Sequence, residues 1–249
     1  MRFINLSDTD IHVFQCLYDV LAVSAASGPI LLLEQPREQV VIGRKAIMEE
    51  CVHLDFCRTN GIPIIRTPSP HNRSMVSYEQ ALKGMVAISL ESPLIAGAAE
   101  GKSLIVKSLV ASVNNLGLSA SYLPKSNNIT VGGRKVSAII SWVSHNILLF
   151  GFSLLLDFDY DRAEQTIISE KNMRESLTTI RKESGRDVTI EEVKTALKQG
   201  FSSVLKIELI DDELTEKETK KAEEAGEKYL SESWIKYGRW SPVKDYGQR

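Results

Sequence analysis

The sequence has few of the residues that build covalent cross-links or metal centres. It contains three cysteines and four histidines among 249 residues. Cys16, Cys51 and Cys57 are odd in number, and no pair has CxxC spacing, so we expect reduced thiols rather than a disulfide framework or a zinc cluster. The histidines are scattered without metal-ligand spacing, and we therefore predict no metal site in the protein.

An excess of charge and a long apolar run are also missing. Thirty Lys and Arg residues against thirty-two Asp and Glu residues give a net charge of −2, which argues against electrostatic binding to nucleic acid or a membrane surface. The longest apolar run, residues 147–156, is far shorter than the roughly 20 residues of a membrane span. The amino terminus lacks the apolar core of a signal peptide. We therefore expect a cytoplasmic protein.

The remaining composition is that of a globular protein, with 43% hydrophobic and 25% charged residues. No linker, low-complexity tract or internal repeat is visible. We expect one domain over residues 1–249, with a core of about 1–180 and a C-terminal helix–strand–helix segment of about 187–240.

Local patterns indicate a mixture of helices and strands. Apolar residues at helical spacing predict helices near 9–27, 47–60 and 105–116, and two capping boxes predict helices that begin after Thr189 and Thr215. Strands are predicted at 30–33 and 40–42 (as a pair), 62–65, 85–90 and 204–210, with a hairpin around Gly132-Gly133 and two core strands within 136–156. Residues 67–77 read as an irregular loop. No strict strand–helix–strand rhythm is present, so the fold class is α+β, with a mixed, mostly antiparallel sheet packed with helices.

The common short motifs of catalysis do not occur. The chain has no phosphate-binding Walker loop, no GxGxxG after a predicted strand and no GxSxG elbow. Composition and spacing alone therefore indicate only an α+β domain.

Several short segments in a fixed order resemble those of the lipoate–protein ligases, archaeal members in particular. These segments are VVIGR at 40–44, IIR at 64–66, NNI at 127–129, GGRKVS at 132–137 and the tail from about 192 to 218. The order of the segments extends over nearly the whole chain, which makes it more specific than any one of them.

The resemblance implies the fold shared by biotin and lipoate ligases and a two-step reaction. In that family ATP and Mg²⁺ activate lipoate or octanoate as an acyl-adenylate, and a lysine of a lipoyl-domain protein then takes the acyl group. Lys135 occupies the place of the family lysine that bridges the acyl carbonyl and the adenylate phosphate, where a fixed cation stabilises developing charge. Arg66, Asn127 and Asn128 are implied to contact the acyl-adenylate. On the residues alone, other interpretations fit equally well. Arg66 fits a surface ion pair, Asn127 and Asn128 fit turn residues, and Lys135 fits an exposed hairpin lysine.

The same segments depart from the family at the nucleotide cradle. Pro70, His71 and Asn72 stand where the family has three glycines. A proline has no N–H, and a β-carbon fills space that the ligand needs. His71 is a candidate replacement for a lost phosphate contact, and Asn128 stands where the family has an aspartate.

Two functions follow from these observations. One is a diverged ligase, in which Lys135 is the catalytic residue. The alternative is a catalytically inactive paralogue that serves as a binding or regulatory subunit of a lipoyl-domain protein or an active ligase. Family members often carry an accessory domain, which archaeal relatives supply as a separate protein, and we expect no such domain in this chain and a separate partner instead.

Overall fold

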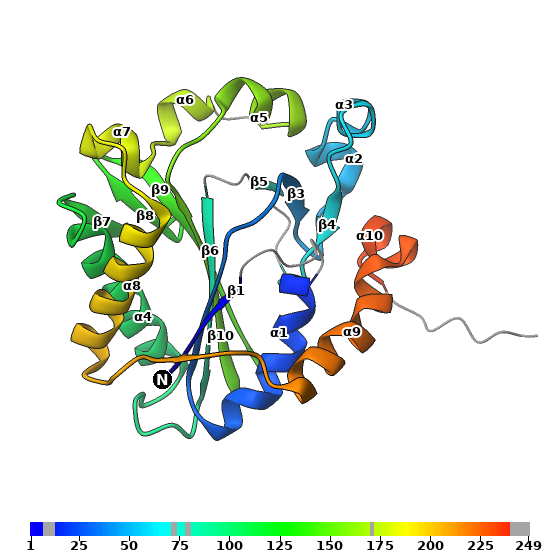
Figure 1. Ribbon diagram of the computed structural model, residues 1–249. Helices are drawn as coiled ribbons and strands as arrows, with labels where there is room; N and C mark the ends of the chain where they lie inside the picture. Colours follow the sequence, from blue (N-terminus) through cyan, green and yellow to red (C-terminus); the bar gives the residue numbers. More distant parts are fainter. Residues whose placement is uncertain (7–12, 71–73, 78–80, 170–171, 240–249) are drawn as a thin grey trace, which may run out of the picture.

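The structure is a computed structural model that describes residues 1–6, 13–70, 74–77, 81–169 and 172–239. Its centre is an eight-stranded sheet with the order β11-β1-β2-β6-β10-β9-β8-β7 (Figure 1). Pairs β11–β1 and β1–β2 are parallel and the other five are antiparallel, which confirms the α+β class. The strands are β1 Arg2–Leu6, β2 Ile30–Glu34, β6 Ala81–Ser89, β7 Ala120–Leu123, β8 Asn128–Val131, β9 Arg134–Ser144, β10 Ile147–Leu155 and β11 Ile210–Asp212.

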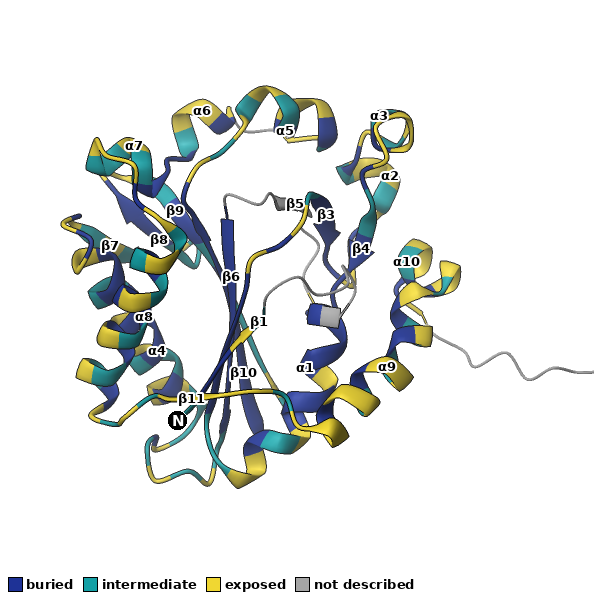
Figure 2. Ribbon diagram, in the orientation of Figure 1, coloured by how far each residue is buried: buried dark blue, intermediate teal, exposed yellow. Residues whose placement is uncertain are grey.

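Helices cover both faces of this sheet. Helices α4 (Ala98–Asn114) and α8 (Ile190–Leu205) lie on one face, and α1 (Val13–Ser24) and α9 (Glu216–Leu230) lie on the other (Figure 1). Every residue of β10 is buried, and Figure 2 shows the central strands buried along their length. A strand covered on both faces needs no polar alternation, which explains the continuous apolar run seen in the sequence.

A second, three-stranded sheet has the order β4-β3-β5. It consists of β3 (Gln39–Ile42), β4 (Ile64–Arg66) and β5 (Ser74–Ser77). The expected pairing of strands 30–33 and 40–42 is therefore wrong, because β2 and β3 belong to different sheets. The irregular loop expected at 67–77 is also wrong at its end, because β5 pairs antiparallel with β3.

The helix expected at 47–60 is two short helices, α2 (Met48–Cys51) and α3 (Leu54–Thr59). Val52, between them, forms an isolated β-bridge with Ile167, and the N–H of His53 donates to the carbonyl of Thr166 at 3.0 Å. These long-range bonds take the backbone groups that a continuous helix would have used.

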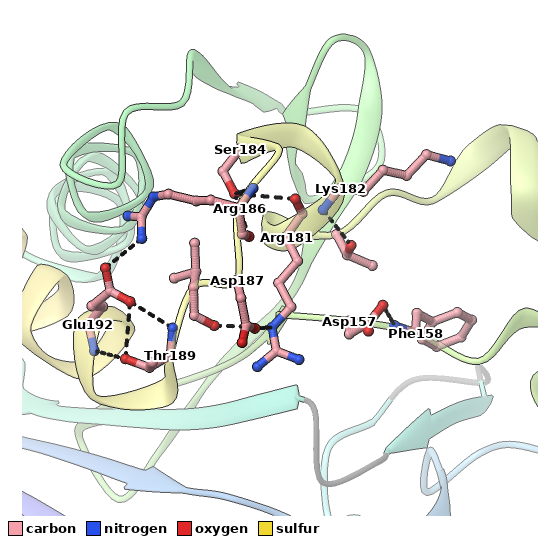
Figure 3. Close-up of polar contacts among 11 residues, drawn as sticks. Asp157, Phe158, Arg181, Lys182, Ser184, Arg186, Asp187, Thr189 and Glu192 are labelled. Atoms are coloured by element: carbon pink, nitrogen blue, oxygen red, sulfur yellow. Dashed lines mark hydrogen bonds and ion pairs between the residues drawn. The ribbon is translucent and has the colours of Figure 1, made fainter.

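Three short helices run over one end of the two sheets (Figure 1). They are α5 (Tyr160–Thr166), α6 (Met173–Ser176) and α7 (Ile180–Ser184). The following helix, α8, begins at the predicted capping box: Thr189 Oγ1 accepts from the N–H of Glu192 at 3.2 Å, and the Glu192 carboxylate accepts from the N–H of Thr189 at 2.8 Å (Figure 3). Arg186 binds the same carboxylate at 2.6 Å.

The C-terminal segment is part of the same sheet and core. The strand expected at 204–210 is wrong, because α8 continues to Leu205 and ends at Lys206, which has a φ of 57°. Only Ile210–Asp212 form β11, which pairs with β1. Helix α9 then packs on α1, and α10 (Glu232–Tyr237) contacts β4. None of the helices in the described ranges is long and apolar enough to cross a membrane.

The first strand is tied to α9 by a buried carboxylate. Arg2 donates to both oxygens of Glu218, at 2.8 and 3.0 Å, and the N–H of Thr215 donates to the same carboxylate at 2.9 Å. Burial pushes the pKa of Glu218 upward, but these hydrogen bonds outweigh it and bring the pKa to about 2.

We expect Glu218→Gln to make the stability of the protein less dependent on acid pH. Because the folded-state pKa of Glu218 lies below its ordinary value of 4.5, its stabilising effect is present at pH 7 and disappears as the pH falls from about 5 towards 2. Urea unfolding from pH 7 to pH 2 should therefore show a difference in the free energy of unfolding between wild type and Glu218→Gln, and this difference should disappear in acid. Glu216→Gln, exposed on the same helix turn, is the control. A difference of constant size would contradict this assignment.

Candidate functional site

A β-bulge decides where the Lys135 side chain lies. Ile129 pairs with Ser137 and Thr130 pairs with Lys135, which leaves Val136 as an extra residue in β9. An extra residue reverses the alternation of the strand. Val136 and Ser137 are both fully buried, and Lys135 therefore lies on the opposite face of the sheet.

That face carries a mostly polar row of residues that crosses the sheet, which we call the polar row. Cross-strand partners lie on the same face, and four successive pairings join Asn128 to Ala138, Ala138 to Ser153, Ser153 to Lys83 and Lys83 to Glu34. Lys135 belongs to this face because its partner Thr130 is two residues beyond Asn128. The row leads from the Lys135 end of the sheet to a buried Lys83–Glu34 pair, and sequence reasoning missed that pair because its two residues belong to strands 49 positions apart.

The backbone of Lys135 is held by the segment between α6 and α7. Leu177 forms an isolated bridge with Lys135, and the N–H of Thr178 donates to the Lys135 carbonyl at 2.9 Å. The phenol of Tyr160 donates to the carbonyl of Leu177 at 3.4 Å. Leu177 therefore contacts both the backbone of Lys135 and the phenol of Tyr160.

Further cations surround Tyr160. The Arg174 guanidinium lies 5.3 Å and the Lys182 ammonium 6.0 Å from the centre of its ring. Lys182 is exposed, and its side chain extends away from the contacts between Arg181 and Asp187 (Figure 3). Burial raises the pKa of Tyr160, so the ring stays neutral at pH 7 and favours neighbouring cations through its π-face. Lys135, Arg174 and Lys182 contribute positive charge to this end of the sheet, where Arg174 also forms ion pairs with Asp161 and Glu164. No sequence motif joins these three positions.

Asn127 and Asn128 differ in their surroundings. Asn127 has a φ of 52°, and its Oδ1 accepts from Lys102 Nζ at 2.9 Å and from the Tyr122 phenol at 2.7 Å. Lys102 belongs to α4, which covers the face opposite to Lys135, so the amide of Asn127 is turned towards α4. Asn128 instead belongs to the polar row. Of the two predicted asparagines, the structure brings only Asn128 to the face of Lys135.

Arg66 lies in the three-stranded sheet and its guanidinium is fully buried. It donates to five backbone carbonyl oxygens at 2.7–3.2 Å, those of Gly43, Arg44, Ala46, Ile235 and Lys236. Its own carbonyl accepts from the indole N–H of Trp234 at 3.0 Å. Arg66 thus joins the end of β3 to α10, and binding a phosphate would require it to exchange these bonds. Burial lowers its pKa, but an arginine stays charged at any physiological pH.

The remaining predicted site residue, His71, lies outside the described residues. Among the residues that are described, no three His, Cys, Asp or Glu side chains gather so as to hold a metal ion.

Comparison with known proteins identifies the class to which this fold and site belong. Residues 76–202, just over half of the chain, match the model of the lipoyl protein ligase A/B catalytic domain. The chain therefore belongs to this family.

Individual relatives agree with that assignment. The chain is 26% identical over 221 residues to lipoate-protein ligase A subunit 1 of Thermoplasma acidophilum, which covers 83% of this chain and 84% of that one. It is 26% identical over 226 residues to octanoyltransferase LipM of Brevibacillus brevis, with 77% and 80% covered. A crystal structure of a lipoate-protein ligase A bound with ATP superposes with a TM-score of 0.85 over 95% of this chain and 98% of that one, at 24% identity. The α+β fold is thus that of the lipoate ligases.

We expect Arg66→Met to destabilise the protein by about 3 kcal/mol or more, because several buried carbonyls would lose a charged donor and find no water. Urea unfolding would measure the loss, and near-ultraviolet circular dichroism would report on Trp234, which bonds to the same residue. Arg58→Met, whose side chain is 81% exposed, is the control. Equal stability of the two variants would show that Arg66 does not hold α10 in place.

Proposed function

We propose that this protein activates lipoate or octanoate with ATP and transfers the acyl group to a lysine of a lipoyl-domain protein. The observation that carries the proposal is the position of Lys135, which the bulge turns onto the polar face of the sheet, the face that also carries Asn128. Family membership supports the reaction class, and the fold shared with an ATP-bound lipoate ligase supports the use of ATP.

The chemistry assigned to these residues is electrostatic. A carboxylate oxygen of the acid attacks the α-phosphorus of ATP, and pyrophosphate leaves as the acyl-adenylate forms. The acceptor amine then attacks the acyl carbonyl, AMP leaves, and the amine proton goes to solvent. The Lys135 ammonium stabilises the negative charge that develops on the carbonyl and phosphate oxygens in both steps.

The neighbouring groups assist by binding the nucleotide. Lys182 supplies positive charge for the leaving pyrophosphate, and Arg174 does so by exchanging its ion pairs with Asp161 and Glu164. The Asn128 amide offers a hydrogen bond on the face of Lys135. Magnesium enters this proposal only as a partner of the ATP phosphates, because Mg²⁺ is commonly held by substrate phosphates together with one or two carboxylates.

A specific observation favours the alternative function, an inactive paralogue that binds partners. Pro70, which is exposed, begins the stretch where the family has three glycines, and it supplies no N–H to a bound phosphate. In this alternative the chain has lost adenylation and serves a lipoyl-domain protein or an active ligase as a binding subunit.

We expect Lys135→Ala to lower the rate of acyl-adenylate formation by about 10²–10³-fold, the usual effect of removing one preorganised charge-stabilising group. Pyrophosphate exchange into ATP, measured with lipoate and with octanoate, reports this step without an acceptor. Lys125→Ala, which removes an exposed lysine in the turn before β8, should leave the rate unchanged. Equal rates in both variants would remove Lys135 from the mechanism.

Partners separate the two functions. An active ligase should add the acyl mass to an apo lipoyl domain, and the second polypeptide of an archaeal bipartite ligase, supplied in the assay, should raise that rate. Full turnover by the isolated chain would refute the need for such a subunit. A stable complex with the lipoyl domain in light scattering, with neither adenylate nor acylated product, would instead establish the binding role.

A further inference from the structure

The polar row of the site ends at a buried ion pair that the proposed mechanism does not use. Lys83 of β6 is 3% exposed and Glu34 of β2 is 2% exposed, and the two residues are direct cross-strand partners. Lys83 Nζ lies 3.7 Å from Glu34 Oε2, which is too far for a hydrogen bond.

The Lys83 ammonium lacks the partners that burial normally demands. It has three N–H groups, and none of them makes a hydrogen bond shorter than 3.5 Å to a described residue. It also lies 5.6 Å from the centre of the Phe14 ring. Burial lowers the pKa of Lys83, while the charge of Glu34 opposes that change. A buried donor without an acceptor costs free energy, and a ligand that accepted from Lys83 would recover it.

The pair lies on the same face of the sheet as Lys135, farther along the polar row. Only Ala138 and Ser153 stand between Asn128 and Lys83 in the polar row, and both side chains are small. Lys83 is two strands from Ala138, a distance of about 10 Å at normal strand spacing. An eight-carbon chain whose carboxyl group met Lys135 would therefore bring its last carbons towards Lys83 and Glu34.

We propose that Lys83 and Glu34 form the far end of the acyl-binding site and select an acid whose distal group is neutral and both donates and accepts hydrogen bonds, such as a hydroxyl or a primary amide. The proposal rests on the function proposed above. The oxygen of such a group accepts from Lys83 while its hydrogen is donated to Glu34. A second carboxylate would meet the charge of Glu34, and an alkyl end would leave the ammonium without an acceptor.

Four eight-carbon acids test this selectivity. They are octanoate, 8-hydroxyoctanoate, the monoamide of suberic acid, and suberate. For the wild-type chain we expect kcat/KM of adenylate formation to favour the hydroxyl or amide acid over octanoate by about tenfold or more, which corresponds to one additional hydrogen bond to a charged group. Suberate should be a poorer substrate than either neutral polar acid.

The paired variant Lys83→Met/Glu34→Leu should reverse the order and favour octanoate. The control is Arg58→Met/Asp55→Leu, which removes an exposed ion pair on α3 and should keep the wild-type order. Lys83→Gln, a neutral donor and acceptor, serves as the second variant if the paired variant does not fold. It should reduce the preference for the hydroxyl acid at least severalfold.

Binding measured without catalysis separates this inference from the function on which it rests. Calorimetry of the free acids with the wild-type chain should show the same order of affinities even if no adenylate forms, in which case only the proposed reaction fails. Equal affinities for octanoate and 8-hydroxyoctanoate, a preference for suberate, or an order that Lys83→Gln and the paired variant leave unchanged would each overturn the inference.

Discussion

The extra residue in β9 is the constraint on which the site depends. Without Val136 out of register, Lys135 would lie on the face that packs against α4 and α8 and would bury its charge in an apolar core. The bulge places the ammonium on the polar face while Val136 still fills the core. The bulge lies at the start of β9, directly after a tight turn. There the N–H of Thr178, in the segment before α7, donates to the Lys135 carbonyl and fixes the backbone. A one-residue change in register thus separates a core position from a site position.

The other predicted side chains show how a fold redistributes polar groups. Arg66 binds five carbonyl oxygens and holds the C-terminal helix α10 against the smaller sheet. Asn127 fixes a turn against Lys102 of α4. Both are polar residues whose hydrogen-bond partners lie within the protein. Lys135 and Asn128 differ from them because the face they share continues to the buried Lys83.

The site combines retained and altered features. Lys135 lies on the polar face of the sheet, while Pro70, which stands where the ligases have a glycine, has no N–H to donate. A site that was decaying without selection would not be expected to hold a lysine and a glutamate together in its buried end, because burying two charges is costly. Under the proposed function, the Lys83–Glu34 pair favours an altered substrate over a lost one.

The sequence alone determined the features that depend on neighbouring residues. Gly132 and Gly133 specify a hairpin because both adopt positive φ, the boxes at Thr189 and Thr215 begin helices through their own side chains, and the continuous apolar run marks a strand buried on both faces. Tertiary structure alone decided which strands pair, because β2 and β3 are close in sequence and lie in different sheets. It also decided the bulge, the partners of Arg66 and the meeting of Lys83 with Glu34. Each of these is a contact between distant segments, and its free energy depends on the packing of the whole chain and not on local propensity.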